Sequence, residues 1–545
     1  MTSKLRIVPI GGLGEIGKNM TVIEYEDEIL IIDAGIMFPE NDMLGIDLII
    51  PDYNYLMDKL DKIRANLVTH GHEDHVGALS HLMRIVDAPI YATRLTTGLI
   101  QGKLREAKIL SETNLITIQA GDLIHIGSFM IEPFHVAHSI PDGVGYGITT
   151  PVGLVVHTGD YKFDHTPVDG WPPDFAKLAD FSSRNVLCLL ADSTNADRPG
   201  WTKSEAVITE AFDKLFREAE GRIIVATFAS LISRIQQVTN AAIRYDRKLA
   251  ITGRSMLNNT RIARELGYLD IPDGIMIDIN QATSLPAHKV VILATGSQGE
   301  PSAALGRLAT GRHAKLNIEQ GDTVVLSAHP IPGNEEMIYR IINRLLQRGA
   351  EVFHEGNANV HVSGHASREE MKFLINLVKP TFFIPVHGEI RHLQAHGKLA
   401  REMGIPEERI AVVENGTILE LDEHTLTIGP RIPGGYIFVD GSGVGDVGPA
   451  VMRDRERLAN SGFFITIVSL DERDQVIGNP EIISRGFVYL EEAGDILEGA
   501  EEVIIRTISA SGRNRDKLNK KIESALSRFL YAETGRRPMV YTIVK

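Results

Sequence analysis

The sequence predicts a multidomain α/β protein, and three observations lead to this prediction. The chain has 545 residues, which at roughly 150 residues per domain suggests three or four domains. Short strand patterns follow one another closely as far as Trp201, and strand and helix patterns alternate after it. A smaller set of strand and helix patterns then closes the chain.

The composition is that of an ordinary globular protein. Hydrophobic residues make up 43% and charged residues 23%, and 71 acidic against 56 basic side chains give a net charge of −15. This balance argues against indiscriminate binding of nucleic acids, although a local basic channel remains compatible with it. No apolar run is long enough to cross a bilayer, and the start of the chain lacks a signal-peptide pattern. Cys188 is the single cysteine, which excludes a cysteine-rich metal site. We therefore expect a cytoplasmic protein.

The first part of the chain is expected to form an antiparallel, sandwich-like structure. Apolar runs, some of them alternating, predict strands at residues 4–10, 20–25, 29–32, 67–69, 124–126, 129–134 and 153–157. Few helix patterns lie between them, and successive strands of this kind usually form packed sheets.

The second part is expected to form a mostly parallel sheet covered by helices on both faces. A helix pattern at residues 204–219 precedes strand patterns at 222–228, 249–252, 290–294, 323–327 and 351–354. Before the last of these strands, five residues have the spacing of one buried helix face: Ile338, Ile341, Ile342, Leu345 and Leu346.

The third part is expected to be a small α+β domain behind a glycine-rich segment. The stretch PGGYIFVDGSGVGDVGPA, from Pro433, predicts an extended linker or loop. Beyond it we expect strands at 463–470 and 486–490, helices near 497–509 and 515–531, and a final strand at 539–544.

Gly12, Gly14 and Gly17 match the dinucleotide-binding fingerprint G-x-G-x-x-G and follow a predicted strand. That fingerprint requires a crossover helix after the third glycine. Here the chain continues as strand, turn and strand, so we expect a tight turn near a functional surface and no nicotinamide site.

The strongest chemical signal is HGHEDH at residues 70–75, directly after a predicted strand. Three imidazoles and a carboxylate so close together suit zinc, which prefers nitrogen and oxygen ligands. His138, Asp160 and His387 also follow predicted strands and supply enough ligands for a second ion. Two ions about 3.5–4 Å apart can stabilise both the attacking and the leaving oxygen of a displacement. We assign one ion to His70, His72 and His138, the other to Asp74, His75 and His387, and Asp160 as the bridge.

These motifs resemble those of the metallo-β-lactamase superfamily, whose hallmark is H-x-H-x-D-H. An α/β segment precedes the last candidate ligand, and Asp192 in LLADSTNAD, His365 in HVSGHAS and His387 in PVHGE match the motifs of β-CASP nucleases. Over essentially the whole chain, the segments GGLGEIGKN, GIDLIIPDY, THGHEDHVGAL, TGSQGEP, HPIPGNE and HVSGH are similar to the ribonuclease J family.

The resemblance implies a fold with defined boundaries. A metallo-β-lactamase αββα sandwich would comprise residues 1–205 and 357–432, with a doubly wound α/β β-CASP domain inserted at 206–356. A linker at 433–461 and a C-terminal α+β domain at 462–545 would complete the chain.

The resemblance also implies an activity. Members are metal-dependent ribonucleases that act 5′ to 3′ on RNA with a 5′ monophosphate and also cut internally, in RNA maturation, rRNA processing and mRNA decay. The implied cofactors are two divalent ions, with zinc preferred and manganese as the alternative, since the ligands suit either. His365 would be the general acid, oriented by Asp192, and Asp74 would act beside the metals.

A pocket for the 5′ phosphate is implied one nucleotide from the metals. Hydroxyl groups, backbone N–H groups and a histidine can hold a phosphate without a large charge. The matching residues are Ser230, Ser233, His361, Val362, Ser363, Gly364 and His365. Separately, Asp47 and Asp440 resemble positions that hold a structural calcium in some members, with ordinary turn aspartates as the alternative.

The implied partners are single-stranded RNA with a 5′-monophosphate end, further copies of the chain in a homodimer or homotetramer, and other RNA-decay proteins, with no membrane. Two other functions stay open: an inactive β-CASP subunit that binds RNA as a scaffold, and a small-molecule metallo-hydrolase. Near the C-terminus, basic residues can contact RNA or form a solvated helix face: Arg513, Arg515, Lys517, Lys520, Lys521 and Arg528.

Overall fold

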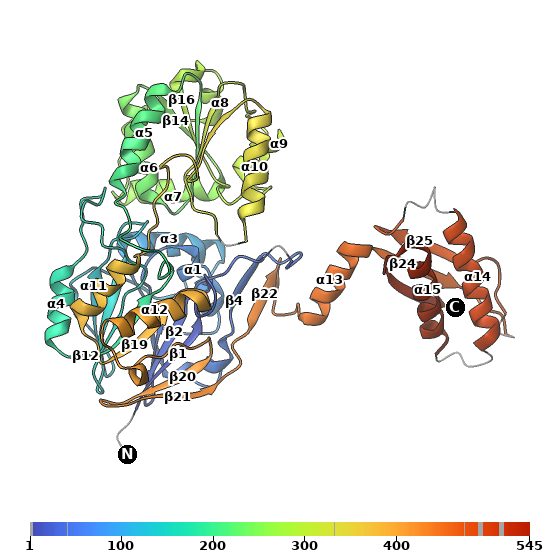
Figure 1. Cartoon of the computed structure of the whole chain (residues 1–545), viewed down its shortest axis with the longest axis horizontal. Helices are drawn as coiled ribbons and strands as arrows, with labels where there is room; N and C mark the ends of the chain where they lie inside the picture. Colours follow the sequence, from blue (N-terminus) through green and yellow to red (C-terminus); the bar gives the residue numbers. More distant parts are fainter. Residues whose placement is uncertain (1–3, 41, 332, 473–474, 489–493, 512–516) are drawn as a thin grey trace. The chain divides into compact units, whose positions relative to one another are not determined.

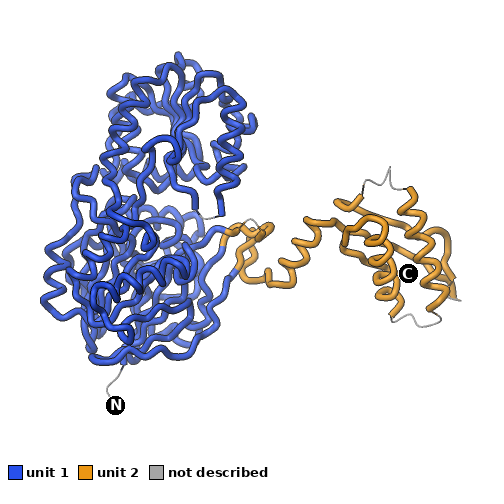
Figure 2. Tube along the Cα trace, in the orientation of Figure 1, with its two compact units in different colours: residues 1–38, 49–437 blue, residues 39–48, 438–545 orange. Residues whose placement is uncertain are grey.

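The computed structural model describes residues 4–40, 42–331, 333–472, 475–488, 494–511 and 517–545. The chain divides into two units, one of residues 1–38 and 49–437, the other of residues 39–48 and 438–545 (Figure 2). Within the described part of the chain, no helix has the length and apolar character needed to span a membrane.

The first sheet of the larger unit has eight strands in the order β21-β20-β1-β2-β3-β5-β6-β7. Pairing is antiparallel from β21 to β3 and parallel from β3 to β7. The strands are β1 Leu5–Gly11, β2 Met20–Tyr25, β3 Glu28–Ile32, β5 Ile63–Leu67, β6 Ile90–Thr93, β7 Leu115–Ile118, β20 Thr417–Leu421 and β21 Leu426–Arg431. The short strand β4 (Leu48–Pro51) lies outside this sheet.

The second sheet has six strands in the order β19-β12-β11-β10-β9-β8. Strands β8 to β11 pair antiparallel, whereas β11, β12 and β19 pair in parallel. The strands are β8 Ile124–Ile126, β9 Phe129–His135, β10 Val144–Thr149, β11 Leu154–His157, β12 Val186–Asp192 and β19 Phe382–Val386.

The two sheets pack face to face and share one hydrophobic core. Ile23 and Leu30 of the first sheet belong to the same buried cluster as Tyr146 and Leu190 of the second. Helix α3 (Arg94–Glu106) lies against β6 and β7. A second cluster packs the outer face of the second sheet against α4 (Phe175–Ser183), α11 (Arg368–Val378) and α12 (Ile390–Glu402). The smaller helices are α1 Glu73–Val76, α2 Leu79–Leu82, η1 Tyr53–Leu56, η2 Leu60–Lys62 and η4 Glu407–Arg409.

The predicted sandwich is therefore confirmed, but the prediction that it is antiparallel is wrong for three of the seven strand pairings in the first sheet and two of the five in the second. The parallel strands β6 and β7 have only four residues each and are joined through α3, so their patterns were too short to read from the sequence. The predicted strand at 67–69 is instead β5, which ends at Leu67.

The third sheet is entirely parallel, in the order β15-β14-β16-β13-β17-β18. Its strands are β13 Ile223–Ala226, β14 Lys248–Thr252, β15 Met276–Ile277, β16 Val290–Ala294, β17 Thr323–Leu326 and β18 Glu351–Phe353. Separate cores on its two faces hold α5, α6 and α7 on one side and α9 and α10 on the other (Figure 1). The helices are α5 Ala206–Glu218, α6 Ile232–Arg244, α7 Arg254–Glu265, α8 Ile279–Ala282, η3 Ala287–Lys289, α9 Ala304–Thr310 and α10 Glu335–Gln347.

This sheet confirms the predicted doubly wound α/β architecture. On α10, Ile338, Ile341, Ile342 and Leu345 are buried as predicted. Leu346 is 50% exposed, so its predicted burial is wrong. It lies at the edge of the apolar face and turns toward solvent.

Strand β22 (Tyr436–Asp440) forms a hairpin with β23 (Gly443–Val444), and from Phe438 onward this segment and the following helix α13 (Pro449–Ser461) belong to the smaller unit. The glycine-rich segment, predicted to be an extended linker or loop, therefore contains a short hairpin. Proline in the first turn of α13 is compatible with a helix, because no intrahelical donor is needed there.

A three-stranded sheet in the order β25-β24-β26 completes this unit. Strands β24 (Phe463–Val468) and β26 (Met539–Val544) pair in parallel, and β25 (Glu481–Arg485) is antiparallel to β24. Helices α14 (Gly494–Ser511) and α15 (Leu518–Thr534) share a core with the sheet. The strand predicted at 486–490 is wrong in position, because β25 ends before Gly486, whose φ of 69° leaves the extended region. Residues 489 and 490 lie outside the described part of the chain.

Candidate metal centre

The candidate ligands gather where neighbouring strands end. His70, His72, Asp74 and His75 follow β5 in the first sheet. In the second sheet, His138 follows β9, Asp160 follows β11 and His387 follows β19. Because parallel strands present their carboxyl ends at the same edge, residues far apart in sequence meet there.

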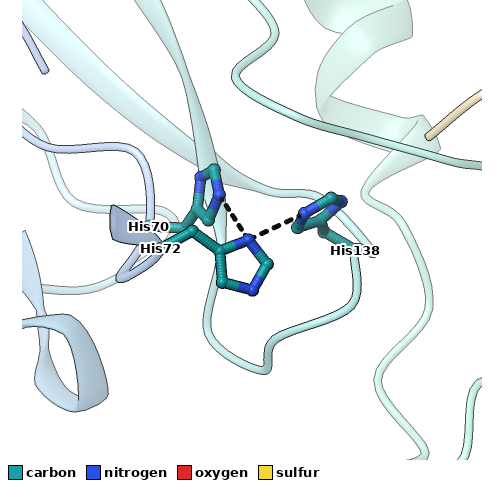
Figure 3. Close-up of side chains that lie close together, drawn as sticks. All are labelled: His70, His72 and His138. Atoms are coloured by element: carbon teal, nitrogen blue, oxygen red, sulfur yellow. Dashed lines mark hydrogen bonds between the residues drawn. The ribbon is translucent and has the colours of Figure 1, made fainter. Parts of the chain in front are cut away.

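His70, His72 and His138 form the first group, with ligand atoms all within 4.8 Å of one another. The Nε2 atoms of His70 and His138 each lie 3.2 Å from Nδ1 of His72 (Figure 3). His138 Nδ1 donates to the carbonyl oxygen of Gly364 at 2.8 Å. Since that carbonyl can only accept, Nδ1 carries the hydrogen and Nε2 has its lone pair free. The imidazoles therefore converge on one point with the chemistry of a cation site.

Asp74, His75, Asp160 and His387 form the second group. His75 Nε2 lies 3.3 Å from Asp160 Oδ2 and 3.6 Å from Asp74 Oδ2. The Nε2 atom of His387 is buried, lies 3.5 Å from Asp74 Oδ2 and makes no hydrogen bond within the described part of the chain. A buried polar atom without a hydrogen bond is costly, and a bound cation would satisfy it.

Asp160 lies between the two groups. Its Oδ2 is 3.7 Å from Nε2 of both His70 and His138, as well as 3.3 Å from His75 Nε2. Its Oδ1 lies 2.7 Å from His387 Nδ1. The residues present therefore fit two divalent ions with one carboxylate between them.

Burial decides the protonation of the first group. It lowers the pKa of His70 and His138 well below the ordinary value and that of His72 to about 4. These imidazoles are neutral near pH 7, which is the form that binds metal.

Carboxylates decide the protonation of the second group. Burial lowers the pKa of His75 and His387, but the carboxylates around them, Asp160 foremost, together outweigh burial. They raise the pKa of His75 well above the ordinary value and that of His387 to about 10. A metal ion would have to displace both protons, so binding there should release protons.

Asp33 supports a ligand in each group, a role that the sequence did not reveal. It accepts hydrogen bonds of 2.8 Å from Thr69 N, Thr69 Oγ1 and His75 Nδ1. Since the Thr69 hydroxyl donates to Asp33, its oxygen accepts from His70 Nδ1 at 3.1 Å. One buried carboxylate thus sets the tautomers of His70 and His75. The one sequence feature that could have identified Asp33 is its position directly after the apolar strand β3.

The glycine motif forms a tight turn beside the second group. Gly14 N donates to Gly388 O at 2.9 Å, and Gly388 N donates to Gly12 O at 3.0 Å. Gly12 and Gly14 have φ of 87° and 81°, which side chains rarely adopt. The motif therefore holds the turn that contains His387. Next to it, Asn19 donates through its backbone N and its Nδ2 to Asp74 O.

His365 and Asp192 form a pair at the edge of the centre. His365 Nδ1 donates to Asp192 Oδ2 at 2.7 Å and lies 3.9 Å from Asp160 Oδ2. Burial lowers the pKa of His365, but the charge of Asp192, its hydrogen bond to the ring and the charge of Asp160 together raise the pKa above the ordinary value, which favours the protonated ring. The side chain is 20% exposed, which leaves it accessible to a substrate. Asp160, Asp192, His365 and His387 also form a third grouping with metal-ligand spacing.

The segment predicted to hold the phosphate runs directly beside the first group. The carbonyl oxygen of Gly364 in this segment accepts the hydrogen bond from His138. Val362 is buried in a hydrophobic core, so only its backbone can face a ligand. The Nδ1 atom of His361 is buried, with no partner among the described residues, and burial lowers its pKa well below the ordinary value.

The two serines predicted to bind the phosphate, Ser230 and Ser233, differ in burial and surroundings. Ser233 is buried and lines a polar recess together with His138, Lys162 and Glu205. Ser230 is half-buried and does not line that recess. Neither is the N-cap of α6, which is Leu231 without a side-chain bond.

The candidate calcium residues have other partners. Asp47 Oδ2 accepts from Gly441 N at 2.7 Å, and Asp440 forms an ion pair with Arg455. Neither belongs to a metal-ligand grouping among the described residues. Near the C-terminus, Lys517, Lys520, Lys521 and Arg528 are exposed, whereas Arg513 and Arg515 lie outside the described residues.

Comparison with known protein families matches four segments of the chain. The Metallo-beta-lactamase superfamily matches residues 13–193, and the Ribonuclease J beta-CASP domain matches 220–345. The Zn-dependent metallo-hydrolase RNA specificity domain matches 354–411, and the Ribonuclease J C-terminal domain matches 450–545.

Similar proteins cover nearly the full length. Ribonuclease J 1 of Streptococcus pyogenes serotype M3 is 43% identical over 99% of this chain and 98% of its own. Ribonuclease J of Thermus thermophilus is 44% identical over 99% and 95%, and Ribonuclease J2 of Bacillus subtilis is 41% identical over 100% and 99%. Among solved structures, a protein of unknown function from Enterococcus faecalis V583 has a TM-score of 0.53 at 14% identity, covering 77% of this chain and 100% of that one. At that identity the likeness concerns the fold alone.

Proposed function

The chain belongs to the ribonuclease J family and is a metal-dependent ribonuclease, and we propose that it degrades single-stranded RNA 5′ to 3′ from a 5′-monophosphate end and also cuts RNA internally. One observation carries this proposal: the bond from His138 to Gly364 joins the first ligand group to the loop that contains Ser363 and His365. The candidate metal ligands therefore lie next to the proposed proton donor and to groups that could donate hydrogen bonds to a phosphate.

Seven residues would hold two divalent ions: His70, His72, His138, Asp74, His75, Asp160 and His387. When bound, the ions would activate water and stabilise negative charge on the phosphodiester. Zinc is the proposed metal, with manganese as the alternative, because imidazole and carboxylate ligands suit both. The convergence of all seven ligands speaks against an inactive scaffold.

His365 is proposed as the general acid for the 3′-oxygen leaving group. The 2.7 Å bond to Asp192 orients the ring and helps it to retain the proton that it would donate. Asp192 is fully within the interior, at 1% exposure, and is held by its strand, β12. It would act as a positioning group for the imidazole.

The 5′ phosphate is proposed to bind the loop of His361, Ser363 and Gly364, together with Ser233. Besides burial, the charges of Arg234, His329, Lys162 and Arg198 depress the pKa of His361, which indicates positive charge around it. Lys162 and Arg234 face Asp164 and Glu205, so part of this charge is already balanced. A pocket of this kind suits a monophosphate better than a triphosphate.

The test uses end-labelled RNA with a 5′ monophosphate, triphosphate or hydroxyl, with and without chelator. Monophosphate RNA should yield mononucleotides fastest, and chelator should stop all cleavage. Internal cleavage should be similar for the three ends. Ser363→Ala should reduce the preference for the monophosphate much more than it reduces internal cutting. An unchanged preference would mean that the phosphate binds elsewhere.

Several further features complete the proposal. The proposed domain boundaries are 1–205 with 357–432 for the metallo-β-lactamase domain and 206–356 for the β-CASP domain. The linker is proposed at 433–461 and the C-terminal domain at 462–545. From the family we also propose that the chain forms a homodimer or homotetramer and has other RNA-decay proteins as partners. A structural calcium at Asp47 and Asp440 and a cytoplasmic location are proposed on the same ground. Mass measurement of the native protein and metal analysis would test the oligomer and the calcium.

A further inference from the structure

Asn195 makes hydrogen bonds to the loop that contains Ser363 and His365. It is 3% exposed and follows Asp192 by three residues. Its Nδ2 donates to Ser363 Oγ at 2.8 Å and to the carbonyl oxygen of His365 at 3.1 Å. Because a carbonyl oxygen can only accept, the amide nitrogen, not the amide oxygen, faces this loop.

These bonds determine the polarity of the Ser363 hydroxyl. Its oxygen accepts from Asn195 Nδ2 and also from the backbone N of His365 at 3.2 Å. A serine hydroxyl has two lone pairs and one hydrogen. With both lone pairs engaged, the hydrogen is what Ser363 offers to a ligand. A group that only accepts, such as a phosphate oxygen, fits this site, whereas a group that must donate does not.

We infer that Asn195 is a positioning residue that makes Ser363 a committed hydrogen-bond donor and thereby favours a 5′ phosphate, whose charged oxygens are strong acceptors, over a 5′ hydroxyl, which is an uncharged and weaker acceptor. This inference rests on the proposed phosphate-binding role of the Ser363 loop. The same amide also supports the backbone of His365, so a single side chain contacts both the phosphate loop and the proton donor.

Thr202 provides a matched control. Its Oγ1 donates to the same His365 carbonyl at 2.8 Å, so this carbonyl keeps a donor when Asn195 changes. Its other side-chain bond is with Ser367 Oγ, at 2.8 Å. Thr202→Val therefore removes one hydrogen bond to the His365 carbonyl and leaves the hydrogen bond from Asn195 to Ser363 in place.

The decisive variant is Asn195→Asp, which keeps the size of the side chain and replaces the donor by an acceptor. The carboxylate would accept the Ser363 hydrogen and turn it away from the ligand. We expect kcat/KM for 5′-monophosphate RNA relative to 5′-hydroxyl RNA to fall by roughly tenfold, the scale of one hydrogen bond to a charged group. Most of the change should be in KM. Cleavage of a circular RNA should fall less, and Thr202→Val should keep the wild-type ratio.

A double variant separates this inference from the function on which it rests. In a Ser363→Ala background, Asn195→Asp should not lower the ratio further, because its effect passes through the missing hydroxyl. If Ser363→Ala itself left the ratio unchanged, the proposed phosphate loop would be wrong. If Ser363→Ala lowered the ratio while Asn195→Asp did not, the role of Asn195 would be overturned. Should Asn195→Asp fail to fold, Asn195→Ala must still lower the ratio about threefold, and an unchanged ratio would equally overturn the inference.

Discussion

His138 and Gly364 are 226 positions apart in sequence and are joined by a 2.8 Å hydrogen bond from the imidazole Nδ1 to the carbonyl oxygen. One is a candidate metal ligand, and the other lies in the loop proposed to bind the 5′ phosphate. A Cβ atom added at Gly364 would lie 2.7 Å from Nδ1 and Cε1 of His138. The close approach of the two segments therefore requires glycine, and it places a candidate metal ligand directly beside the loop proposed to bind the phosphate.

The first prediction follows from this contact. Gly364→Ala should displace His138, lower the bound metal below that of the wild type and slow RNA cleavage by at least tenfold. Metal analysis of the purified protein and single-turnover cleavage would measure both effects. Gly435→Ala is the control, since nothing lies within 4 Å of its added Cβ. Full metal content and full activity in Gly364→Ala would show that the contact is not needed.

Much of the fold was predictable because long, regular patterns identify their elements. The strands predicted at 20–25, 290–294 and 539–544 coincide with β2, β16 and β26. Some of the elements that were missed are short, such as β6 and β7, or rich in glycine, such as the hairpin of β22 and β23, but the longer strands β12 and β21 were missed as well. Their stability comes from neighbouring strands, which local sequence does not reveal.

The candidate ligands were predictable for a different reason. Three histidines within six positions form a distinctive pattern even before any contact is known. Asp33 and Asn195 carry no such pattern, because each is a single polar residue in a turn-like segment. Asn195 acquires its role by meeting Ser363, 168 positions away. The role proposed for Asn195 depends on the pairing of β12 with β19, and that of Asp33 depends on the pairing of β3 with β5, neither of which local sequence specifies.

The second prediction concerns the support of the ligands. Asp33→Asn removes a carboxylate that accepts three hydrogen bonds, and the new amide would direct a donor at Thr69 or His75. We expect affinity for the divalent ions to fall about 10–100-fold. Competition with a chromophoric chelator would measure it. Asp61→Asn, at an exposed position, should retain wild-type affinity; equal affinity in both variants would contradict the role of Asp33.

The third prediction separates a proton donor from a metal ligand. His365→Ala should keep the metal content of the wild type while cleavage slows by about 10²–10⁴-fold, as expected for loss of a general acid. His75→Ala should instead lose metal together with activity. If His365→Ala also lost an ion, then the grouping of Asp160, Asp192, His365 and His387 would be the true ligand set.

The fourth prediction concerns acid stability and rests on His396, away from the ligands. The side chain is fully buried on α12, its Nδ1 lies 3.0 Å from Ser193 Oγ, and its Nε2 has no partner among the described residues. Burial lowers the pKa of His396 to about 3, whereas an unfolded histidine has a pKa of about 6.5. Below pH 6.5 the unfolded chain therefore binds a proton that the folded chain does not, and stability falls as the pH is lowered.

The loss should amount to about 1.4 kcal/mol per pH unit, or about 2 kcal/mol between pH 6.5 and pH 5. His396→Gln removes this titration, although it also perturbs packing against Phe383. The readout is therefore the change with pH in the difference between wild type and variant, measured by urea unfolding from pH 7.5 to pH 5. The variant should be the less stable protein at pH 7.5 and should recover about 2 kcal/mol relative to wild type at pH 5. His125→Gln, in the exposed part of β8, controls for the loss of one histidine. A constant difference across this range would mean that His396 is protonated in the folded protein as readily as in the unfolded chain.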